Sequence, residues 1–240
     1  MALKVLLALV IALQFVFVPW FLKAMWPEKN KKSLALKMVC AALFLFTGIL
    51  AQKISANTTP YAFWMTLGLV FGFIGDFFLH AGSKMGYYIA GVMAFLTGHC
   101  CFITAFNGAS EKLLPGPGFF EPGEIIAFAG LVLAMIIFVI KKKLRLGPIL
   151  IPTFVYASVL ITMMIKGCSL GLRAFLSPAY GVAALLPATG AFLFFVSDVL
   201  WANVNFNNNK QNRPMKNANI ITYFAGQVLL ACSMLVIIPA

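Results

Sequence analysis

The sequence predicts an all-α integral membrane protein, with eight transmembrane helices in one bundle. Of its 240 residues, 62% are hydrophobic and 10% are charged, whereas soluble domains carry roughly 25% charged residues. The hydrophobic residues gather into runs of about 20, the length of helix that crosses ~30 Å of hydrocarbon. Most lysines and arginines stand in the short segments between these runs. We therefore expect a single transmembrane domain that covers residues 1–240.

The first two spans are residues 3–22 and 33–51. The first is interrupted by Gln14. It is longer and more aromatic than the apolar core of a signal peptide, so we expect it to be retained. A basic loop leads into the second span, where Lys37 stands one turn from the start. Lys37 is either a residue whose ammonium reaches back to the membrane surface or a residue that binds a substrate.

Six further spans follow, separated by breaks that are rich in turn-forming or basic residues. A proline opens the third span, and Gly82-Ser83-Lys84 separates it from the fourth. A long segment rich in glycine and proline precedes the fifth span, and a run of basic residues ends it. Ser177-Pro178 precedes the seventh span, and a polar loop precedes the eighth. These six spans are residues 61–81, 85–107, 124–140, 148–165, 179–203 and 218–238.

Lysine and arginine are concentrated in the loops that follow the first, third, fifth and seventh spans. Cytoplasmic loops of membrane proteins carry such an excess. An even number of spans puts both termini on one side, so we expect the termini outside and the basic loops in the cytoplasm. The basic residues form no stripe with interleaved aromatic residues, so we expect no nucleic-acid partner.

Two of the six acidic residues, Asp76 and Asp198, lie well inside predicted spans, whereas the four glutamates fall in loops or at the start of a span. A charged side chain in hydrocarbon is costly, which makes it a candidate functional residue. Each aspartate stands about six residues from the cytoplasmic end of its span, roughly 9 Å at 1.5 Å per residue. We therefore expect the two carboxylates to share one cavity that opens towards the cytoplasm.

The sequences around the two aspartates resemble each other. Residues 73–76 align with residues 195–198 at an interval of 122, and Gly98-His99 aligns with Gly226-Gln227 at an interval of 128. Four spans in each half would make the halves parallel repeats, related by an axis along the membrane normal. Chance similarity between apolar helices is the alternative.

Other polar residues in the spans are candidates for substrate binding. His80 follows Asp76 by one turn, on the face that also carries Gly68 and Gly72, so the two side chains can pair. Tyr223 is a further polar group that needs a partner. For each such residue the alternative role is an interhelical hydrogen bond that holds the bundle together. The candidates are Lys37, His80, His99, Tyr156, Ser197, Asn203 and Gln227.

Two carboxyl groups buried near each other share one proton, which provides one acid and one base near pH 7. Such a pair can hydrolyse an acid-labile C–O bond: the acid delivers a proton, and the carboxylate stabilises the resulting cation or activates water. The same pair can act as a proton relay in a transporter of a small lipid or amphiphile, or can simply hold helices together. The residues alone leave these three functions open.

No sequence motif requires a metal or another cofactor. The two histidines stand on different spans, and neither a His-Glu-x-x-His motif nor a phosphate-binding glycine loop occurs. The five cysteines show no Cys-x-x-Cys spacing, so we expect them to be small buried hydrophobic residues. We therefore expect an active site built from protein side chains.

These motifs resemble those of the YhhN family of integral membrane proteins, whose characterised members are lysoplasmalogenases. The most specific match is residues 190–198, Gly-Ala-Phe-Leu-Phe-Phe-Val-Ser-Asp. Gly75-Asp76, Gly98-His99 and the sequence Tyr-Phe-Ala-Gly-Gln of residues 223–227 match as well, so the resemblance covers spans three to eight. The chain departs from the family at Cys101-Phe102, near the place where a tyrosine is common after Gly-His.

The resemblance implies hydrolysis of the vinyl ether bond of a lysoplasmalogen, a lysophospholipid with an ethanolamine or choline head group. The products would be a fatty aldehyde and a glycerophospho head group. We expect Asp198, whose neighbours in sequence are mostly apolar, to be the general acid, and Asp76 to stay ionised as base or cation stabiliser. The phosphate of the substrate would lie near the basic loops, where Lys37, Lys84 or Arg213 could meet it.

Overall fold

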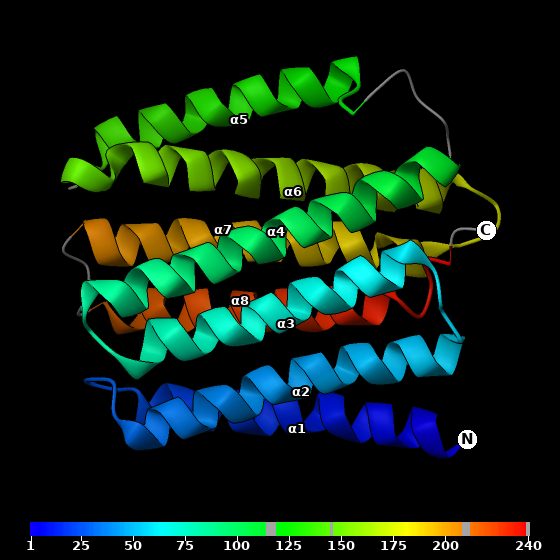
Figure 1. Cartoon of the computed structure of the whole chain (residues 1–240), viewed down its shortest axis with the longest axis horizontal. Coiled ribbons are helices and arrows are strands. Elements are labelled where there is room, and N and C mark those ends of the chain that lie inside the picture. The colour runs from blue at the N-terminus through cyan, green and yellow to red at the C-terminus, as the bar shows by residue number, and fades with distance from the viewer. Residues whose placement is uncertain (114–118, 145, 208–211, 239–240) are drawn as a thin grey trace.

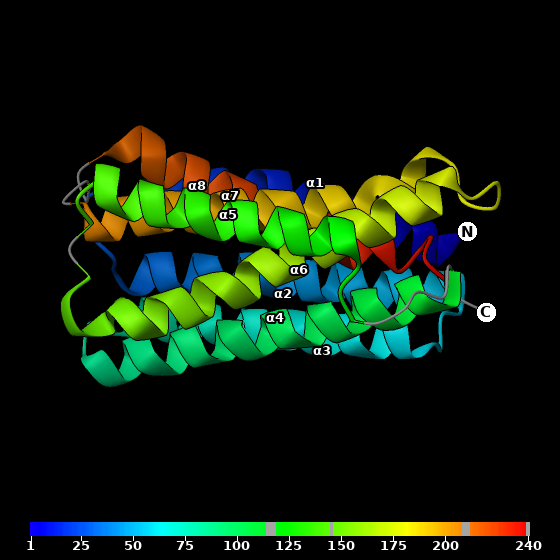
Figure 2. The ribbon, with the colours of Figure 1, turned by 90° about the horizontal axis from the view of Figure 1, so that it is seen from above.

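The computed structural model describes residues 1–113, 119–144, 146–207 and 212–238, and within them it contains eight long α-helices and no strand. Consecutive helices run in opposite directions, so the two termini lie at the same end of the bundle (Figure 1). Figure 2 shows two layers, with α6 crossing obliquely from one to the other. The elements are α1 Ala2–Ala24, α2 Lys31–Ser55, α3 Pro60–Ala81, α4 Met85–Leu113, α5 Pro122–Lys141, η1 Gly147–Ile149, α6 Leu150–Leu176, η2 Val182–Leu185, α7 Leu186–Phe206 and α8 Arg213–Ser233.

Seven of these helices are long and apolar enough to cross a membrane, which identifies a multi-pass membrane protein. The helix outside this set is α8, because polar residues such as Arg213, Lys216 and Asn219 occupy its first two turns. The prediction of an all-α membrane protein is confirmed. The eighth membrane span stays a prediction.

The sixth helix is longer than the span expected from sequence. The expected span ends at residue 165, just before Lys166, but α6 continues to Leu176. Lys166 is only 3% exposed, because its ammonium forms an ion pair with Glu124 at 2.7 Å and donates to the carbonyl of Phe119. Arg173 pairs with Glu121 nearby. These contacts tie the start of α5 to the second half of α6, and the charge therefore does not end the helix.

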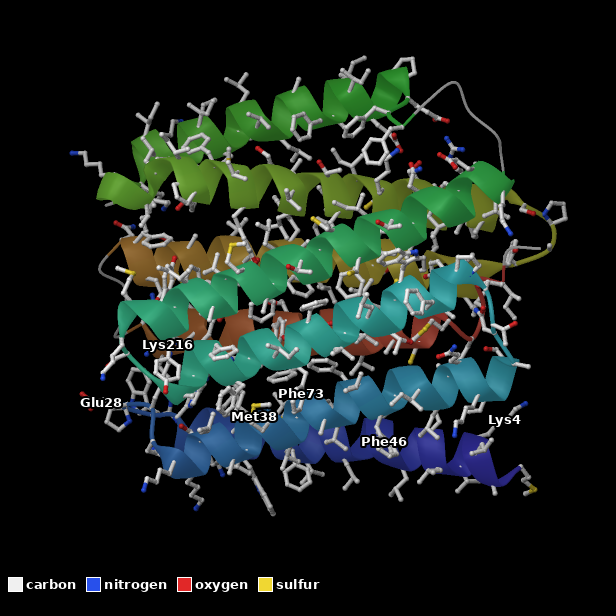
Figure 3. All side chains as sticks on the ribbon, viewed as in Figure 1. Lys4, Glu28, Met38, Phe46, Phe73 and Lys216 are labelled. Carbon is white, nitrogen blue, oxygen red and sulfur yellow. The ribbon has the colours of Figure 1, made fainter. Side chains whose placement is uncertain are left out.

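The lysine-rich loops lie at the end of the bundle opposite the termini. Figure 3 places Lys4 at the end that carries the termini and Glu28 and Lys216 at the other end. Two of the basic residues assigned to these loops, Arg145 and Lys210, lie outside the described residues. We call the end with Glu28 and Lys216 the basic end.

The packing of the helices follows the same plan in both halves of the chain. The most extensive contacts join α3 to α4 in the first half and α7 to α8 in the second. α2 packs against α3 and α8, whereas α6 packs against α7 and α4. α5 lies at the edge of the bundle, against α6 (Figure 1).

Two glycines allow these helix pairs to approach closely. A Cβ on Gly98 would lie 3.2 Å from the carbonyl oxygen of Gly68, and one on Gly226 would lie 2.9 Å from that of Gly190. Small residues permit such backbone contacts between membrane helices. The contact partners are again 122 and 128 residues apart, as in the sequence alignment of the halves.

Replacement of Gly226 by alanine should lower the free energy of unfolding by about 1–3 kcal/mol, because the added methyl group meets backbone that has to move. Thermal or denaturant unfolding in detergent measures this change. Gly130→Ala is the matched control, since a Cβ at Gly130 of α5 meets nothing within 4 Å. Alanine is the better helix former, so the control should be neutral or slightly stabilising. Equal melting of the two variants would contradict the packing argument.

Candidate active site

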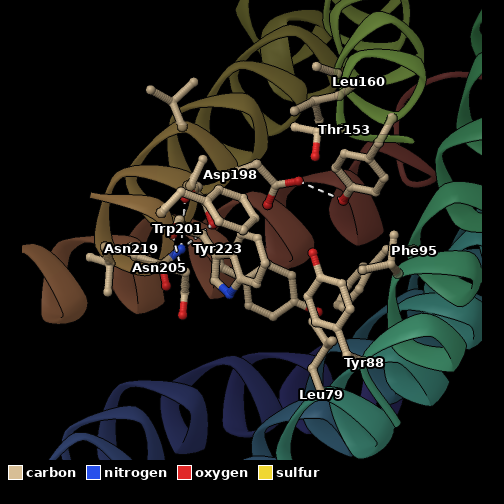
Figure 4. Close-up of a pocket in the computed structure, with 18 of the residues that line it drawn as sticks. Leu79, Tyr88, Phe95, Thr153, Leu160, Asp198, Trp201, Asn205, Asn219 and Tyr223 are labelled. Carbon is tan, nitrogen blue, oxygen red and sulfur yellow. Dashed lines mark hydrogen bonds between the residues drawn. The ribbon is translucent and has the colours of Figure 1, made fainter. Parts of the chain in front are cut away.

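A cavity of about 1290 Å³ is lined by residues of the basic end and by residues of the bundle interior. Figure 4 shows part of this lining. Glu28, Lys29 and Lys216 line it near the loops, and Asp76 and Asp198 line it deeper inside. Most of the remaining lining side chains are apolar, including those from α4, α5 and α6. Cavities of 300–1,000 Å³ accommodate drug-sized ligands, so this one is large enough for a single-chain lipid.

Asp76 is 1% exposed, and both oxygens of its carboxylate have protein partners. Lys37 of α2 forms an ion pair with Oδ1 at 2.8 Å. The hydroxyl of Tyr223 in α8 donates to Oδ2 at 2.8 Å, and the amide of Gln227 donates in turn to that hydroxyl at 3.2 Å. Gly72 makes room for this amide, because a Cβ there would lie 2.8 Å from Nε2 of Gln227. Asp76 is thus held by an ammonium group and a phenol.

The expected pairing of His80 with Asp76 is replaced by another contact. Nε2 of His80 lies 2.7 Å from the hydroxyl of Ser33. Ser33 forms a capping box with Asn30 at the start of α2, which fixes the position of that helix end. One turn later, Lys37 reaches the carboxylate of Asp76. The interhelical ion pair forms in place of the i,i+4 contact because opposite charges attract strongly where water is excluded.

Asp198 has a more open and electrically neutral environment. Its side chain is 19% exposed. The hydroxyl of Tyr156 in α6 donates to Oδ2 at 2.7 Å (Figure 4). Nε2 of His99 in α4 lies 3.0 Å from that hydroxyl and 3.8 Å from Oδ2. Among the described residues we find no hydrogen bond to Oδ1.

The hydrogen-bond partners favour one tautomer of the His99 ring. Its Nδ1 is buried and has no hydrogen-bond partner among the described residues. A buried N–H without an acceptor is costly, so Nδ1 carries the lone pair and Nε2 carries the proton. With this tautomer His99 donates to the hydroxyl of Tyr156, which donates to Asp198.

The two aspartates occupy corresponding places but have different partners. Each is contacted by the second helix of its own half, α2 or α6, and by a network from the last helix of the other half, α8 or α4. The second helix supplies an ammonium, Lys37, to Asp76 and a phenol, Tyr156, to Asp198. Asp76 therefore has a full counter-charge, whereas Asp198 has neutral donors.

The candidate residues from the sequence divide into two groups. His99, Gln227 and Asn203 are at most 8% exposed and lie behind the cavity wall. The first two act on the tyrosines, and Nδ2 of Asn203 contacts Sδ of Met215 at 3.4 Å. The other candidates line the cavity itself: Asp76, Asp198, Lys37, His80, Tyr156 and Ser197.

The sequence-based set lacks several polar cavity residues, among them Tyr223, Asn219, Lys29 and Lys216. Tyr223 stands four residues before Gln227, a spacing that places both on one helix face and could have joined them. Asn219 donates to Oγ of Ser197 at 3.0 Å (Figure 4). Lys29 and Lys216 come from loops or helix starts, where charge is ordinary. Within the described part of the chain, no group of three or more histidine, cysteine or acidic residues could hold a metal ion.

Comparisons with known proteins place this geometry in context. The model of the YhhN family matches residues 32–234, which include both aspartates and all their partners. A curated relative, "Lysoplasmalogenase homolog" of Dictyostelium discoideum, is 27% identical over 202 residues, which are 74% of this chain and 65% of the relative. The chain thus spans slightly less than two thirds of that relative's length. No solved structure matches the chain significantly.

Proposed function

Because this chain belongs to the YhhN family, we propose that it is a lysoplasmalogenase-like hydrolase that cleaves the vinyl ether bond of lysoplasmalogens. The name of the Dictyostelium relative, a lysoplasmalogenase homologue, supports this reaction. The observation that carries the proposal is the cavity with two unequal carboxylates, Asp76 paired with a cation and Asp198 held by neutral donors. The reaction requires a carboxylic acid that gives a proton to carbon, and we assign this role to Asp198.

The first step is protonation of carbon. Asp198 in its neutral form transfers its proton to the outer alkene carbon of the vinyl ether, and the ether oxygen shares the resulting positive charge as an oxocarbenium ion. Asp198 suits this transfer because it lines the cavity and its Oδ1 has no hydrogen-bond partner among the described residues, so this oxygen is free to carry the proton towards a bound substrate. The carboxylate left after transfer faces the cation and stabilises it.

The second step is capture of the cation by water. Water adds to the carbon next to the ether oxygen and gives up one proton to the Asp198 carboxylate. The resulting hemiacetal collapses to a fatty aldehyde and a glycerophospho compound with a free hydroxyl. Asp198 ends the cycle protonated, so no external acid or base is consumed.

Asp76 has a supporting role in this scheme. Both of its oxygens are engaged, by Lys37 and Tyr223, so the carboxylate remains ionised and does not take the proton of the water. It fixes the hydroxyl of Tyr223, which lines the same cavity as Asp198. In this scheme Asp76 does not act as the base. It positions Tyr223 in the wall of the cavity that also contains Asp198.

The cavity suits a substrate with one hydrocarbon chain. Ile89 and Met93 of α4 and Leu131, Met135 and Phe138 of α5 form an apolar part of its lining. Burial of each CH₂ group of a hydrocarbon chain contributes about 0.8 kcal/mol. A lipid tail can therefore lie between these helices while the head group remains near the basic end.

Contacts between the helices support two further proposals about the fold. We propose that α8 also crosses the membrane, because the polar groups of its first turns face protein partners: Asn219 bonds to Ser197, and Lys216 lies over the ring of Trp26. We also propose that helices α1–α4 and α5–α8 are parallel repeats. The glycine contacts are equivalent in the two halves, and the partners of the two aspartates come from equivalent helices, which supports this relation. With the basic end in the cytoplasm, the cavity would open on that side.

The test is incubation of the purified protein with a lysoplasmalogen, followed by mass spectrometry of the products. We expect a fatty aldehyde and a glycerophospho head group in equal amounts. Sealed vesicles with a pH gradient provide the contrasting measurement. Movement of the lipid that depends on the gradient, without a covalent product, would favour a proton-coupled transporter and refute the hydrolase.

A further inference from the structure

Positively charged side chains converge where the cavity meets the basic end. Lys29 and Lys216 line the cavity there, and Lys37 lies deeper. The ammonium of Lys29 donates to the carbonyl of Leu79 at 2.7 Å, at the last turns of α3. The ammonium of Lys216 lies 5.3 Å from the ring centre of Trp26. The loop between α1 and α2 and three helices, α2, α3 and α8, thus bring these charges to one part of the cavity.

The proximity of these ammonium groups has a measurable consequence. The pKa of Lys29 is lowered to about 8, first by loss of solvent around its ammonium and then by repulsion from Lys37 and Lys216. The charge of Lys37 is balanced by Asp76. Repulsion of this kind disappears when an anion lies between the lysines, so the cluster favours a bound anion.

An acidic side chain adjoins the same opening. Glu28 is exposed and lines the cavity next to Lys29. A cluster with two cations and one carboxylate complements a group that carries an anion and a cation. Charge-assisted hydrogen bonds from ammonium to phosphate are among the strong interactions available to a protein. Phosphoethanolamine and phosphocholine have this distribution of charge.

We infer that Lys29 and Lys216 bind the phosphate of a lysophospholipid head group and that Glu28 binds its ammonium group. The identity of the lipid rests on the proposed function. Asp198 lies about two helical turns before the end of α7, deeper in the same cavity. A head group at the opening would thus direct the glycerol and the vinyl ether towards Asp198.

The inference is tested with a lipid that cannot be hydrolysed, so the result does not depend on catalysis. The probes are 1-alkyl-lysophosphoethanolamine, the same 1-alkylglycerol without phosphate, and inorganic phosphate. Binding is measured by the rise in melting temperature with probe concentration. We expect the wild type to bind the phospholipid at least about tenfold more tightly than the alkylglycerol.

The variants Lys29→Ala and Lys216→Ala should each weaken binding of the phospholipid by about tenfold and leave binding of the alkylglycerol unchanged. Lys32→Ala, which removes an exposed lysine outside the cavity lining, should bind both probes as the wild type does. Equal effects on both lipids, or no effect on either, would overturn the inference. Stabilisation by inorganic phosphate alone that depends on Lys29 would also overturn it, since the site would then be a general anion site.

Turnover separates this inference from the proposed reaction. If the head-group site is wrong, the lysine variants keep the preference of the wild type for the phospholipid over the alkylglycerol, and aldehyde is still released from the alkenyl lipid. If the reaction is wrong, no aldehyde forms although the saturated probe binds through Lys29 and Lys216.

The lowered pKa of Lys29 predicts a pH dependence. Between pH 7 and pH 9 the ammonium loses its proton as the pH rises through about 8, so affinity for the phospholipid should fall. The charged or titratable groups facing it are Glu28, Lys37, His80 and Lys216. The probe is 1-alkyl-lysophosphocholine, whose quaternary ammonium does not titrate.

In Lys29→Arg the guanidinium stays charged over this range, so the affinity should stay nearly constant. A wild-type affinity that does not change between pH 7 and pH 9 would contradict a charged contact from Lys29.

Discussion

Replacement of Asp198 by asparagine should lower the rate of aldehyde release by about 10²–10⁴-fold, the range that general acid catalysis contributes. Asparagine has nearly the same shape and still accepts a hydrogen bond from Tyr156, so the helices should remain in place. It has no acidic proton to give to carbon. Initial rates of aldehyde formation from a lysoplasmalogen, measured by mass spectrometry at saturating substrate, report the loss.

Two variants define what the loss means. Tyr156→Phe removes the donor to Asp198 but keeps its carboxyl group, so we expect a smaller decrease, about tenfold, with a changed pH profile. Asp76→Asn should reduce the rate less than Asp198→Asn, because Asp76 does not transfer a proton in our scheme. Near-normal turnover in Asp198→Asn would exclude it as the acid. A larger loss in Asp76→Asn, in a folded protein, would reverse the roles.

The sequence was sufficient to find the two aspartates because a charge inside an apolar run is conspicuous. It was also sufficient for the helical class, since runs of about 20 apolar residues have few other structures available. The partners were harder to predict. Lys37 belongs to another helix, and its distance from Asp76 along the chain carries no information about register between helices. Its place near the start of α2 suggested a residue that reaches for the membrane surface.

The glycines of α3 illustrate why local patterns are ambiguous. A stripe such as Gly68 and Gly72 can leave room for a backbone, a ligand or a side chain. Gly68 accommodates the ring of Phe102 in addition to its backbone contact with Gly98, and Gly72 accommodates the amide of Gln227. Both roles require a small residue, so the sequence pattern is the same for each. Only the packing of α4 and α8 decides which side chain fills the space.

Replacement of Lys37 by methionine should be the most destabilising single change at the site. Methionine keeps much of the hydrocarbon length of lysine but removes its charge. It leaves Asp76, 1% exposed, without its counter-ion. Removal of one partner from a buried ion pair costs about 3–5 kcal/mol, because the remaining charge stays desolvated. For a chain of this size that corresponds to a fall of roughly 10 °C in melting temperature.

The double variant Lys37→Met/Asp76→Asn should recover most of this loss, since it buries no charge and asparagine can still accept from Tyr223. Lys166→Met breaks the comparable ion pair with Glu124 in α5 and is the control for stability alone. Both single variants should melt early, but only Lys37→Met should also reduce the turnover of the molecules that remain folded. If Lys37→Met melts like the wild type, the ion pair does not hold Asp76 in its charged state. The difference between the two aspartates, and with it the assignment of Asp198 as the acid, would then lose its physical basis.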